Sequence, residues 1–322
     1  MSKQLFVGVD IGSVSTNIVG MDEAGQILAA HYYRNDGQPL QVIQEGLANL
    51  AKTAGKAAIA GVGATGSGRL LAGAILGADL IKNEITSHAA AALHFYPAVQ
   101  TVLEIGGQDS KIIIIRNGIV TDFAMNTVCA AGTGSFLDHQ AERLKIPIEE
   151  FGDLALTAAK KVRIAGRCTV FAESDMIAKQ QFGFSKAEII NGLCEALVRN
   201  YLSNLARDKQ LAGPVVFQGG VAANIGIKAA FERELKTAVT VPPHYGVMGA
   251  IGAALLTQKQ LQKTRRLSKF RGFEKLALNF APSTFECNGC SNCCEVIQVA
   301  QDNRIIASWG DKCGKHSHNI SA

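Results

Sequence analysis

The chain lacks any apolar run long enough to cross a membrane. No apolar segment of its 322 residues reaches the roughly 18 residues that a membrane-spanning helix needs. The first residues, Met1-Ser-Lys-Gln, lead directly into an expected strand instead of a signal peptide. Since 48% of the residues are hydrophobic, there is enough apolar material for two ordinary cores. We therefore expect a soluble, cytoplasmic, globular protein without a membrane partner.

The chain also lacks a broad surface of one charge. Its formal net charge is +5, but seven basic residues and one acidic residue fall between positions 259 and 275. The remainder of the chain is close to neutral. One basic connector accounts for the balance, and such a run is typical of a solvated linker or an amphipathic helix. A nucleic-acid partner is not expected.

Cysteine, in contrast, is plentiful for a cytosolic chain. Disulfide frameworks are rare in that compartment, so the eight cysteines indicate metal or redox chemistry. Cys194 is the exception, because it falls on the expected packed side of a helix over 185–206 and is predicted to be a small core residue. Five cysteines crowd into the C-terminal tail: Cys287, Cys290, Cys293, Cys294 and Cys313.

A strand that ends in an acidic residue, any residue and glycine occurs twice. Asp10-Ile-Gly-Ser and Glu104-Ile-Gly-Gly match at an offset of 94 residues, and Asn17 then matches Lys111. Each copy predicts a strand, a tight glycine turn and a second strand. The glycine lets backbone N–H groups approach an anion, and the carboxylate can hold a divalent cation directly or through water. Two such hairpins facing each other would clamp a magnesium polyphosphate.

These patterns predict which residues bind the nucleotide and its metal ion. Asp10 is assigned to Mg²⁺, and Gln108, Asp109 and Glu104 are assigned to catalysis, with Gln108 and Asp109 as candidates to orient or deprotonate the attacking water. A third strand and double glycine, at 214–224, would lie against the adenosine. The predicted backbone and nucleotide contacts are Gly12, Ser13, Val14, Ser15, Gly106, Gly107, Gln108, Gly219, Gly220 and Asn224.

Other polar segments are given weaker interpretations. The stretch 63–68 is rich in glycine but lacks the lysine and terminal Ser/Thr of a Walker motif, so we interpret it as a flexible turn. His88 and His94 follow the helix start after Asn83 with no second ligand type at helical spacing, which favours core or surface roles.

Two cysteines lie at expected helix starts. Cys129 precedes Ala-Ala-Gly-Thr-Gly-Ser135, and Cys168 precedes another expected helix. The first turn of a helix has unpaired N–H groups and a partial positive charge, which stabilise a thiolate, a phosphate or an anionic metal cluster.

Together, the two hairpins, the Cys129 and Cys168 segments and Phe217-Gln-Gly-Gly-Val-Ala-Ala-Asn224 resemble the activators of 2-hydroxyacyl-CoA dehydratases, in the BadF/BadG/BcrA/BcrD ATPase family. The resemblance covers roughly residues 4–257. It implies an α/β fold of the actin, heat-shock chaperone and sugar-kinase ATPase type with two ribonuclease H-like lobes. The lobes are expected at 1–100, with the closing helix near 245–257 returning to the first, and at 101–257. A basic linker and Cys-rich tail would follow at 258–322.

The resemblance also implies a function. Family members are homodimers that bind ATP and Mg²⁺ and hold one [4Fe–4S] cluster between subunits, here through Cys129 and Cys168. Two thiolates per chain cannot complete a four-thiolate cluster, which agrees with a symmetric partner. ATP would drive an electron from ferredoxin or flavodoxin into a dehydratase or a double-cubane cluster protein. Asn17 stands where the family often has lysine, and Glu104 where it commonly has aspartate.

Two other functions stay open at this point. A small-molecule kinase of the same fold would need a substrate pocket, and a nucleotide-gated assembly protein of the actin type would form polymers without needing its thiols. In the tail, the spacing of Cys287, Cys290, Cys294 and Cys313 suits a thiolate site for zinc or an iron–sulfur centre; the alternative is a set of reduced or adventitiously oxidised thiols.

Overall fold

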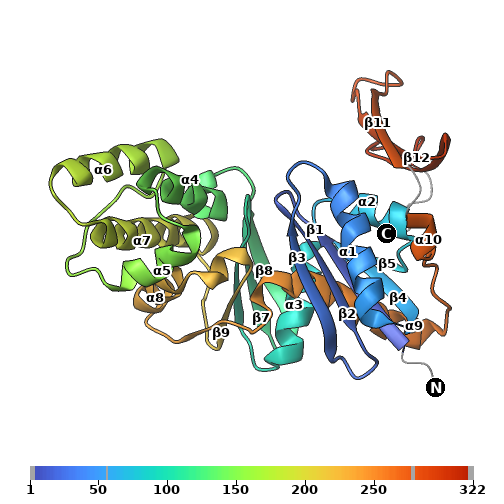
Figure 1. The fold of residues 1–322 in the computed structure, drawn as a ribbon, viewed down its shortest axis with the longest axis horizontal. Coiled ribbons are helices and arrows are strands. Elements are labelled where there is room, and N and C mark those ends of the chain that lie inside the picture. Colours follow the sequence, from blue (N-terminus) through green and yellow to red (C-terminus); the bar gives the residue numbers. More distant parts are fainter. Residues whose placement is uncertain (1–3, 56, 277–279, 318–322) are drawn as a thin grey trace. The chain divides into compact units, whose positions relative to one another are not determined.

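The structure of the protein is a computed structural model that describes residues 4–55, 57–276 and 280–317. The ends of the predicted domain ranges, residues 1–3 and 318–322, lie outside the described residues. The chain divides into two compact units. The first comprises Met1–Ala91 with Gly249–Ala322, and the second comprises Ala92–Met248 (Figure 1).

The first unit is built on a five-stranded sheet in the order β3-β2-β1-β4-β5. Strands β1, β2 and β3 pair antiparallel, and β4 and β5 add in parallel. Helix α1 begins with a proline, whose missing N–H costs nothing at that position, and ends at Gly55. The elements are β1 (Gln4–Ile11), β2 (Ser15–Met21), β3 (Ile27–Arg34), α1 (Pro39–Ala54), β4 (Ala58–Thr65), α2 (Arg69–Leu76), β5 (Leu80–Ile81) and α3 (Glu84–Phe95).

Small residues bring helix α9 (Met248–Thr264) against this sheet. A Cβ atom at Gly8 would lie 1.8 Å from the Ala250 carbonyl oxygen, and one at Gly63 would lie 2.4 Å from that of Ala253. Real side chains do not tolerate such distances, so strand and helix backbones touch only because glycine is present. The glycines of β1 and β4 therefore allow α9 to pack tightly against the sheet.

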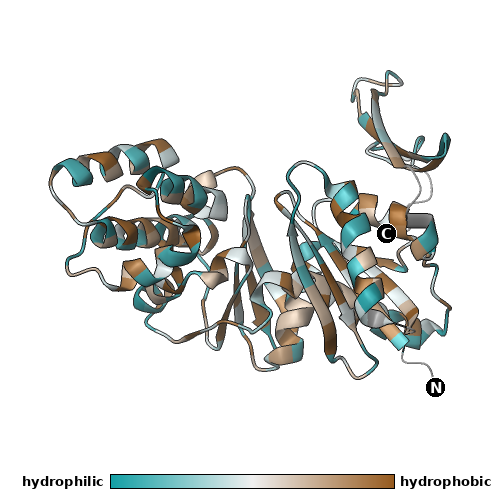
Figure 2. Ribbon diagram, in the orientation of Figure 1, coloured by the Kyte–Doolittle hydropathy of each residue, from teal (hydrophilic) through white to brown (hydrophobic). Residues whose placement is uncertain are grey.

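The second unit repeats the first sheet. Its strand order is β8-β7-β6-β9-β10. As in the first sheet, the first two pairs in this order are antiparallel and the last two are parallel. Brown and teal residues alternate along its helices in Figure 2, as expected for helices with one face on a core. The elements are β6 (Thr101–Ile105), β7 (Ser110–Arg116), β8 (Ile119–Asn126), α4 (Gly134–Leu144), α5 (Ile148–Leu156), α6 (Thr169–Gln181), α7 (Lys186–Leu205), β9 (Val215–Gln218), α8 (Ile225–Leu235) and β10 (Val239–Thr240).

Helix α7 is the central helix of the second core. Ser185 and Glu188 form a reciprocal capping box at its start, which satisfies two otherwise unpaired N–H groups. Cys194 on this helix is fully buried, and burial raises the pKa of its thiol to about 12. The burial of Cys194 confirms the prediction that it is a core residue. A buried thiol with a raised pKa is chemically inert.

Short elements complete the chain. Three 3₁₀ helices, η1 (Ala130–Gly132), η2 (Gly220–Ala223) and η3 (Tyr245–Val247), lie in loops of the second unit. The basic connector is helical as far as Thr264 and is followed by α10 (Phe273–Leu276). The tail is a three-stranded antiparallel sheet of β11 (Phe280–Glu286), β12 (Glu295–Gln301) and β13 (Arg304–Trp309).

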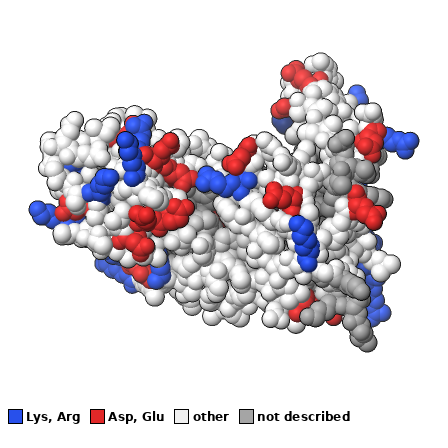
Figure 3. All heavy atoms as spheres, viewed as in Figure 1, with Lys and Arg blue, Asp and Glu red and all other residues white. Residues whose placement is uncertain are grey.

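On the face of the molecule shown in Figure 3, acidic and basic side chains are interspersed. Among the described residues, no helix is long and apolar enough to span a bilayer.

Candidate functional site

The two predicted hairpins have the same structure. Asp10 lies opposite Asn17 in the first, and Glu104 lies opposite Lys111 in the second. Each turn is closed by the same backbone hydrogen bond, from Gly12 N to Ser15 O at 2.9 Å and from Gly106 N to Asp109 O at 3.0 Å. The repeat at an offset of 94 residues is thereby confirmed as a structural repeat.

The Asp10 side chain is buried between polar neighbours. It is 7% exposed, and its cross-strand neighbours are Asn17 on β2 and Thr65 on β4, whose side chains lie on the same face of the sheet. Within the described part of the chain, Asn17 Oδ1 and Thr65 Oγ1 are buried without a hydrogen-bond partner. A Cβ atom at Gly249 would lie 2.0 Å from Asp10 Oδ2. Glycine therefore preserves the space beside the carboxylate, where His88 Nε2 also lies 3.2 Å from the same Cβ position. The Asp10 carboxylate and the side-chain oxygens of Asn17 and Thr65 are ligand types that suit Mg²⁺.

The second hairpin has an ammonium group at the equivalent place. Lys111 Nζ lies 3.1 Å from Glu104 Oε2 and 2.8 Å from Asp109 Oδ2. Lys111 is 2% exposed, and its stem is part of a buried strand. The match of Lys111 with Asn17 in the sequence gave no sign of this double ion pair. Lys111 therefore pairs with both predicted catalytic carboxylates, Glu104 and Asp109, whereas Gln108 stays exposed on the turn.

The third glycine segment is a close-approach turn. Gly219 has φ of 90°, and a Cβ atom there would lie 2.4 Å from Ile105 O. Gly220 begins η2. Asn224 caps helix α8, since its Oδ1 accepts a hydrogen bond from Ile227 N at 3.1 Å, while its Nδ2 is buried without a partner among the described residues. The Asn224 amide N–H therefore remains the group that could bind a ligand.

The interpretation of residues 63–68 as one flexible turn is wrong in its first half. Strand β4 continues to Thr65 and pairs Gly63 with Gly8 of β1. Only from Gly66, at φ of 93°, does the chain turn toward α2. Of the two histidines, His88 is buried and His94 is exposed, with its ring edge-on to Phe95.

Cys129 lies in a loop that its neighbour Asn126 fixes. Asn126 Oδ1 accepts from Cys129 N at 2.9 Å, and Asn126 Nδ2 donates to Cys129 O at 2.8 Å. Cys129 caps the three-residue helix η1, and α4 starts only at Gly134. The expectation that Cys129 stands at the start of a full helix is therefore corrected, because the Ala-Ala-Gly turn intervenes.

Cys168 is the N-cap residue of α6, as expected, and its segment contacts that of Cys129. Cys129 Sγ lies 3.9 Å from the carbonyl oxygen of Arg167, the residue before Cys168. Apolar side chains beside both cysteines are open to solvent: Val128 is 94% exposed and Phe171 is 67% exposed. Two half-buried thiols at the edge of an exposed apolar surface suit a ligand set that another chain completes.

The start of α4 is bonded to the second hairpin. Gly134 N donates to Gly106 O at 2.9 Å, and Ser135 N donates to Gly107 O at 2.8 Å. The Ser135 hydroxyl also donates to Gly107 O, at 2.6 Å. The turn predicted to bind phosphate is thus connected to the segment that carries Cys129. The sequence signal for this connection was only the Gly132-Thr-Gly134 spacing, which did not identify Ser135.

The tail cysteines lie around the hairpin between β11 and β12. Cys287 N donates to Cys294 O at 2.8 Å, and Cys293 N donates to Cys290 O at 3.2 Å. Cys287 Sγ lies 3.3 Å from His316 Nε2. Cys313 Sγ lies 3.8 Å from Asp311 Oδ2. Spacing alone missed His316, because it follows the last cysteine.

The comparison with known proteins identifies the family. The model of the BadF/BadG/BcrA/BcrD ATPase family matches residues 7–257. The chain belongs to this family.

Two of the similar proteins are activators. The (R)-2-hydroxyglutaryl-CoA dehydratase activating ATPase of Acidaminococcus fermentans is 35% identical over 260 residues, which cover 80% of this chain and 98% of that protein. The crystal structure of the activator of the 2-hydroxyisocaproyl-CoA dehydratase from Clostridium difficile, with bound ADPNP, has a TM-score of 0.74 at 31% identity and covers 81% of this chain and 97% of that one.

More distant neighbours share the fold alone. A glucokinase from Streptomyces griseus has a TM-score of 0.51 at 16% identity and covers 79% of this chain and 99% of that one. The predicted α/β fold of the actin and sugar-kinase ATPases, with its small tail, is thereby confirmed. The family match ends at residue 257, so the tail lies beyond it.

Proposed function

We propose that this ATPase is a homodimeric iron–sulfur protein that uses ATP to drive an electron from ferredoxin or flavodoxin into a partner iron–sulfur enzyme. The partner is a 2-hydroxyacyl-CoA dehydratase or a double-cubane cluster protein. The observation that carries the proposal is the contact between the Cys129 and Cys168 segments, together with the hydrogen bonds that join this region to the glycine turn at 106–107. The names of the relatives as dehydratase activators support the acceptor.

ATP would bind at the two hairpins, with Mg²⁺ held by Asp10. The oxygen donors around Asp10 fit this ion, which when bound neutralises phosphate charge. Lys111 would supply a fixed positive charge in the second hairpin, where its ammonium group forms ion pairs with Glu104 and Asp109. Backbone N–H groups of both turns would face the phosphates. We assign the orientation of the attacking water to Gln108, since Asp109 is occupied by its lysine.

The cluster would be shared between two chains. Cys129 and Cys168 fit thiolate ligation because both are N-cap residues near helix N–H groups. In the part of the chain that the structure describes, no three His, Cys, Asp or Glu side chains form a metal-binding group. We assign the other two ligands of a four-thiolate cluster to the same cysteines of a second copy, and the exposed Val128 and Phe171 would be covered in the dimer. The bound cluster supplies a one-electron carrier.

Anaerobic purification tests this function directly. With Cys287 and Cys290 replaced by serine to exclude metal in the tail, the otherwise wild-type protein is expected to contain four iron and four sulfide per dimer. Reduced flavodoxin should then pass electrons to an added dehydratase only when MgATP is present. An analogue that cannot be hydrolysed, such as ADPNP, should bind without sustaining turnover. A dimer without iron, or transfer at equal rates with and without ATP, would refute the proposal.

We also propose a second metal site in the tail, formed by Cys287, Cys290, Cys294 and one further ligand. Cys287 and Cys294 are neighbours across the hairpin, and His316 brings the 311–317 loop against Cys287. Asp311 holds this loop, because the Ser317 hydroxyl and the His316 amide donate to its carboxylate and lower its pKa. Since these side chains are not yet gathered into one group, Cys290 and the fourth ligand, Cys313 or His316, must turn inward on binding.

Metal content measures the tail site separately from the core cluster. In a Cys129→Ser background, the full chain is expected to retain one zinc ion or one iron–sulfur centre. Cys287→Ser and Cys290→Ser should remove it, because a tetrahedral thiolate site does not tolerate loss of a ligand. Cys293→Ser is the matched control and should keep it. Cys313→Ser and His316→Ala identify the fourth ligand, and retention of metal in the Cys287 and Cys290 variants would contradict the site.

A further inference from the structure

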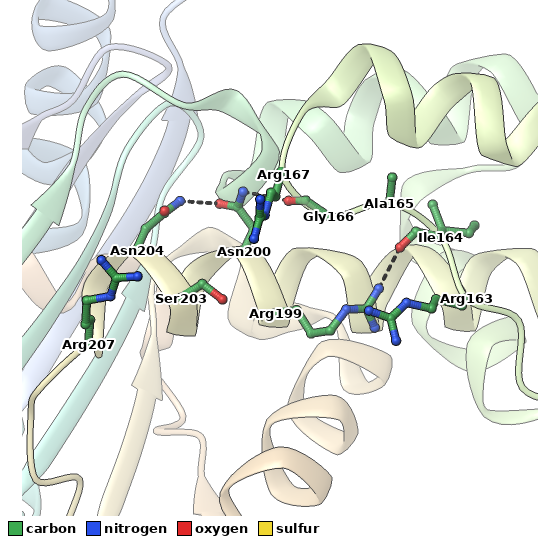
Figure 4. Close-up of a pocket in the computed structure, with 10 residues that line it drawn as sticks. All are labelled: Arg163, Ile164, Ala165, Gly166, Arg167, Arg199, Asn200, Ser203, Asn204 and Arg207. Atoms are coloured by element: carbon green, nitrogen blue, oxygen red, sulfur yellow. Dashed lines mark hydrogen bonds between the residues drawn. The ribbon is translucent and has the colours of Figure 1, made fainter.

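A pocket lined by four arginines opens beside the Cys129 and Cys168 segments. Its volume is about 670 Å³. One wall is the segment 163–167, and the other is the C-terminal half of α7 with the residues that follow it (Figure 4). Apart from Ile164, Ala165 and Gly166, the lining is polar: Arg163, Arg167, Arg199, Asn200, Ser203, Asn204 and Arg207.

One of the arginines is part of the fold. Arg199 is half-buried, donates to Ile164 O at 2.6 Å and lies 3.9 Å from Glu195. Arg163, Arg167 and Arg207 are exposed, and none of them pairs with a carboxylate among the described residues. Three unpaired guanidinium groups around a concave, polar surface create a positive potential that attracts anions.

The pocket is adjacent to the cysteines through shared residues. Asn200 lines it, donates to Gly166 O at 2.6 Å and lies 3.8 Å from Cys129 Sγ through the same Nδ2 atom. Arg167 directly precedes Cys168, and its carbonyl oxygen contacts Cys129 Sγ. A molecule bound in the pocket is therefore placed next to the Cys129 thiol and the residue that precedes Cys168.

We propose that this arginine pocket is the docking site for the acidic surface of the protein that donates electrons. The proposal rests on the electron-transfer function above, and it adds the place where the donor binds and the residues that recognise it. The interfaces between transient redox partners are typically small and polar, and opposite charges steer the two proteins into position. A polar, basic pocket fits this kind of contact, whereas the apolar residues Val128 and Phe171 suit the permanent dimer.

Charge reversal at the rim tests the pocket in the full-length protein. Arg163→Glu with Arg207→Glu avoids the structural Arg199 and leaves Arg167 next to Cys168 unchanged. At low salt, the affinity for oxidised flavodoxin and the second-order rate of reduction by its reduced form should each fall about tenfold or more. The deficit should shrink as salt rises, because the charges are screened. Arg163→Gln with Arg207→Gln should give a smaller deficit.

Four controls make the result specific. Lys160→Glu with Lys161→Glu changes the net charge equally on the same segment but outside the pocket, and its effect should be less than twofold. Reduction by methyl viologen radical cation should not be slower in the pocket variant, because added negative charge attracts a cation, and ATP hydrolysis and thermal unfolding should be unchanged. The last control is needed because cations also stabilise the C-terminal end of α7.

Several outcomes would overturn the assignment. Donor affinity that stays at the wild-type value in the pocket variant would do so, and so would equal losses in the pocket and lysine variants. A variant with normal donor binding that fails only in transfer to the dehydratase would assign the pocket to the acceptor instead. Because flavodoxin binding is measured without reference to iron, it tests the pocket even if the wild-type protein proves to lack a cluster, which would refute the proposed function alone.

Discussion

Replacing Cys129 by serine is expected to remove the iron–sulfur cluster and ATP-driven electron transfer while ATP hydrolysis continues. A hydroxyl group is a poor ligand for iron, and by symmetry the change removes two of the four ligands in each dimer. Iron, sulfide and visible absorbance after anaerobic purification measure the loss. Electron transfer to the acceptor should fall to background. Cys168→Ser should give the same result, and the double variant should be no worse, because the ligands act as one unit.

The matched control is Cys194→Ala, which removes a cysteine that is fully buried in the core of the second unit. It should retain the cluster, although it is expected to lower stability by about 1 kcal/mol or more because a buried side chain is shortened. Substitution of Cys287 and Cys290 by serine in all these proteins excludes a contribution from tail metal. If the Cys129→Ser protein kept four iron per dimer, the cluster would be bound by residues other than Cys129 and Cys168.

The parts of the structure that sequence predicted well depend on local pattern. The two hairpins could be predicted because strand pairing next to a tight turn is fixed by residues close in sequence, and Asp10 and Glu104 occur at equal distances from their glycines. Cys194 could be assigned to the core because helical periodicity identifies a packed face. The domain boundaries at 100 and 257, and the role of each nucleotide residue, remain predictions.

Other features depend on contacts between distant segments or on details of local backbone geometry, and they were missed from the sequence. Arg163 and Arg207 are 44 positions apart, and only the packing of the 163–167 segment along α7 makes them walls of one pocket. The Asn224 side chain was assigned to adenosine, but its oxygen is used to cap α8. The delay of α4 until Gly134 was also missed, since three residues of 3₁₀ helix resemble the start of an α-helix in sequence.

Lys111 shows how one residue changes the meaning of a repeat. The acid-x-glycine pattern alone assigns equal metal-binding capacity to Asp10 and Glu104. In the structure, the cross-strand neighbour of Asp10 is Asn17, whereas that of Glu104 is Lys111, whose ammonium lies 3.1 Å from the carboxylate. An ammonium at that distance satisfies the Glu104 charge and makes a cation there unnecessary. The lysine therefore distinguishes the second half of the repeat from the first.

Substitutions where α4 meets the second hairpin are expected to uncouple ATP hydrolysis from electron transfer. A Cβ atom at Gly134 would lie 3.0 Å from Gly106 O and 3.0 Å from Val221 Cγ2, so Gly134→Val must push the helix away from the turn. Ser135→Ala is milder and removes only the hydroxyl hydrogen bond to Gly107 O. Both variants leave the cysteines and Asp10 unchanged. The number of electrons transferred per ATP hydrolysed should fall about 5- to 150-fold in Gly134→Val. A coupling free energy of roughly 1–3 kcal/mol produces this range.

The direction of this effect follows from the path of the bonds. Gly107 O accepts from both Ser135 groups, Thr133 binds back to Ala130 O at 3.0 Å through its N–H, and Ala130 follows Cys129 directly. A change of the turn on nucleotide binding therefore reaches the thiol through a few short, directional contacts. Ser174→Ala, which removes an exposed serine hydroxyl on α6, is the matched control and should leave coupling intact. If Gly134→Val hydrolysed ATP and transferred electrons in the wild-type ratio, the nucleotide would have to act on the cluster by another route, through the packing of the dimer instead of through α4.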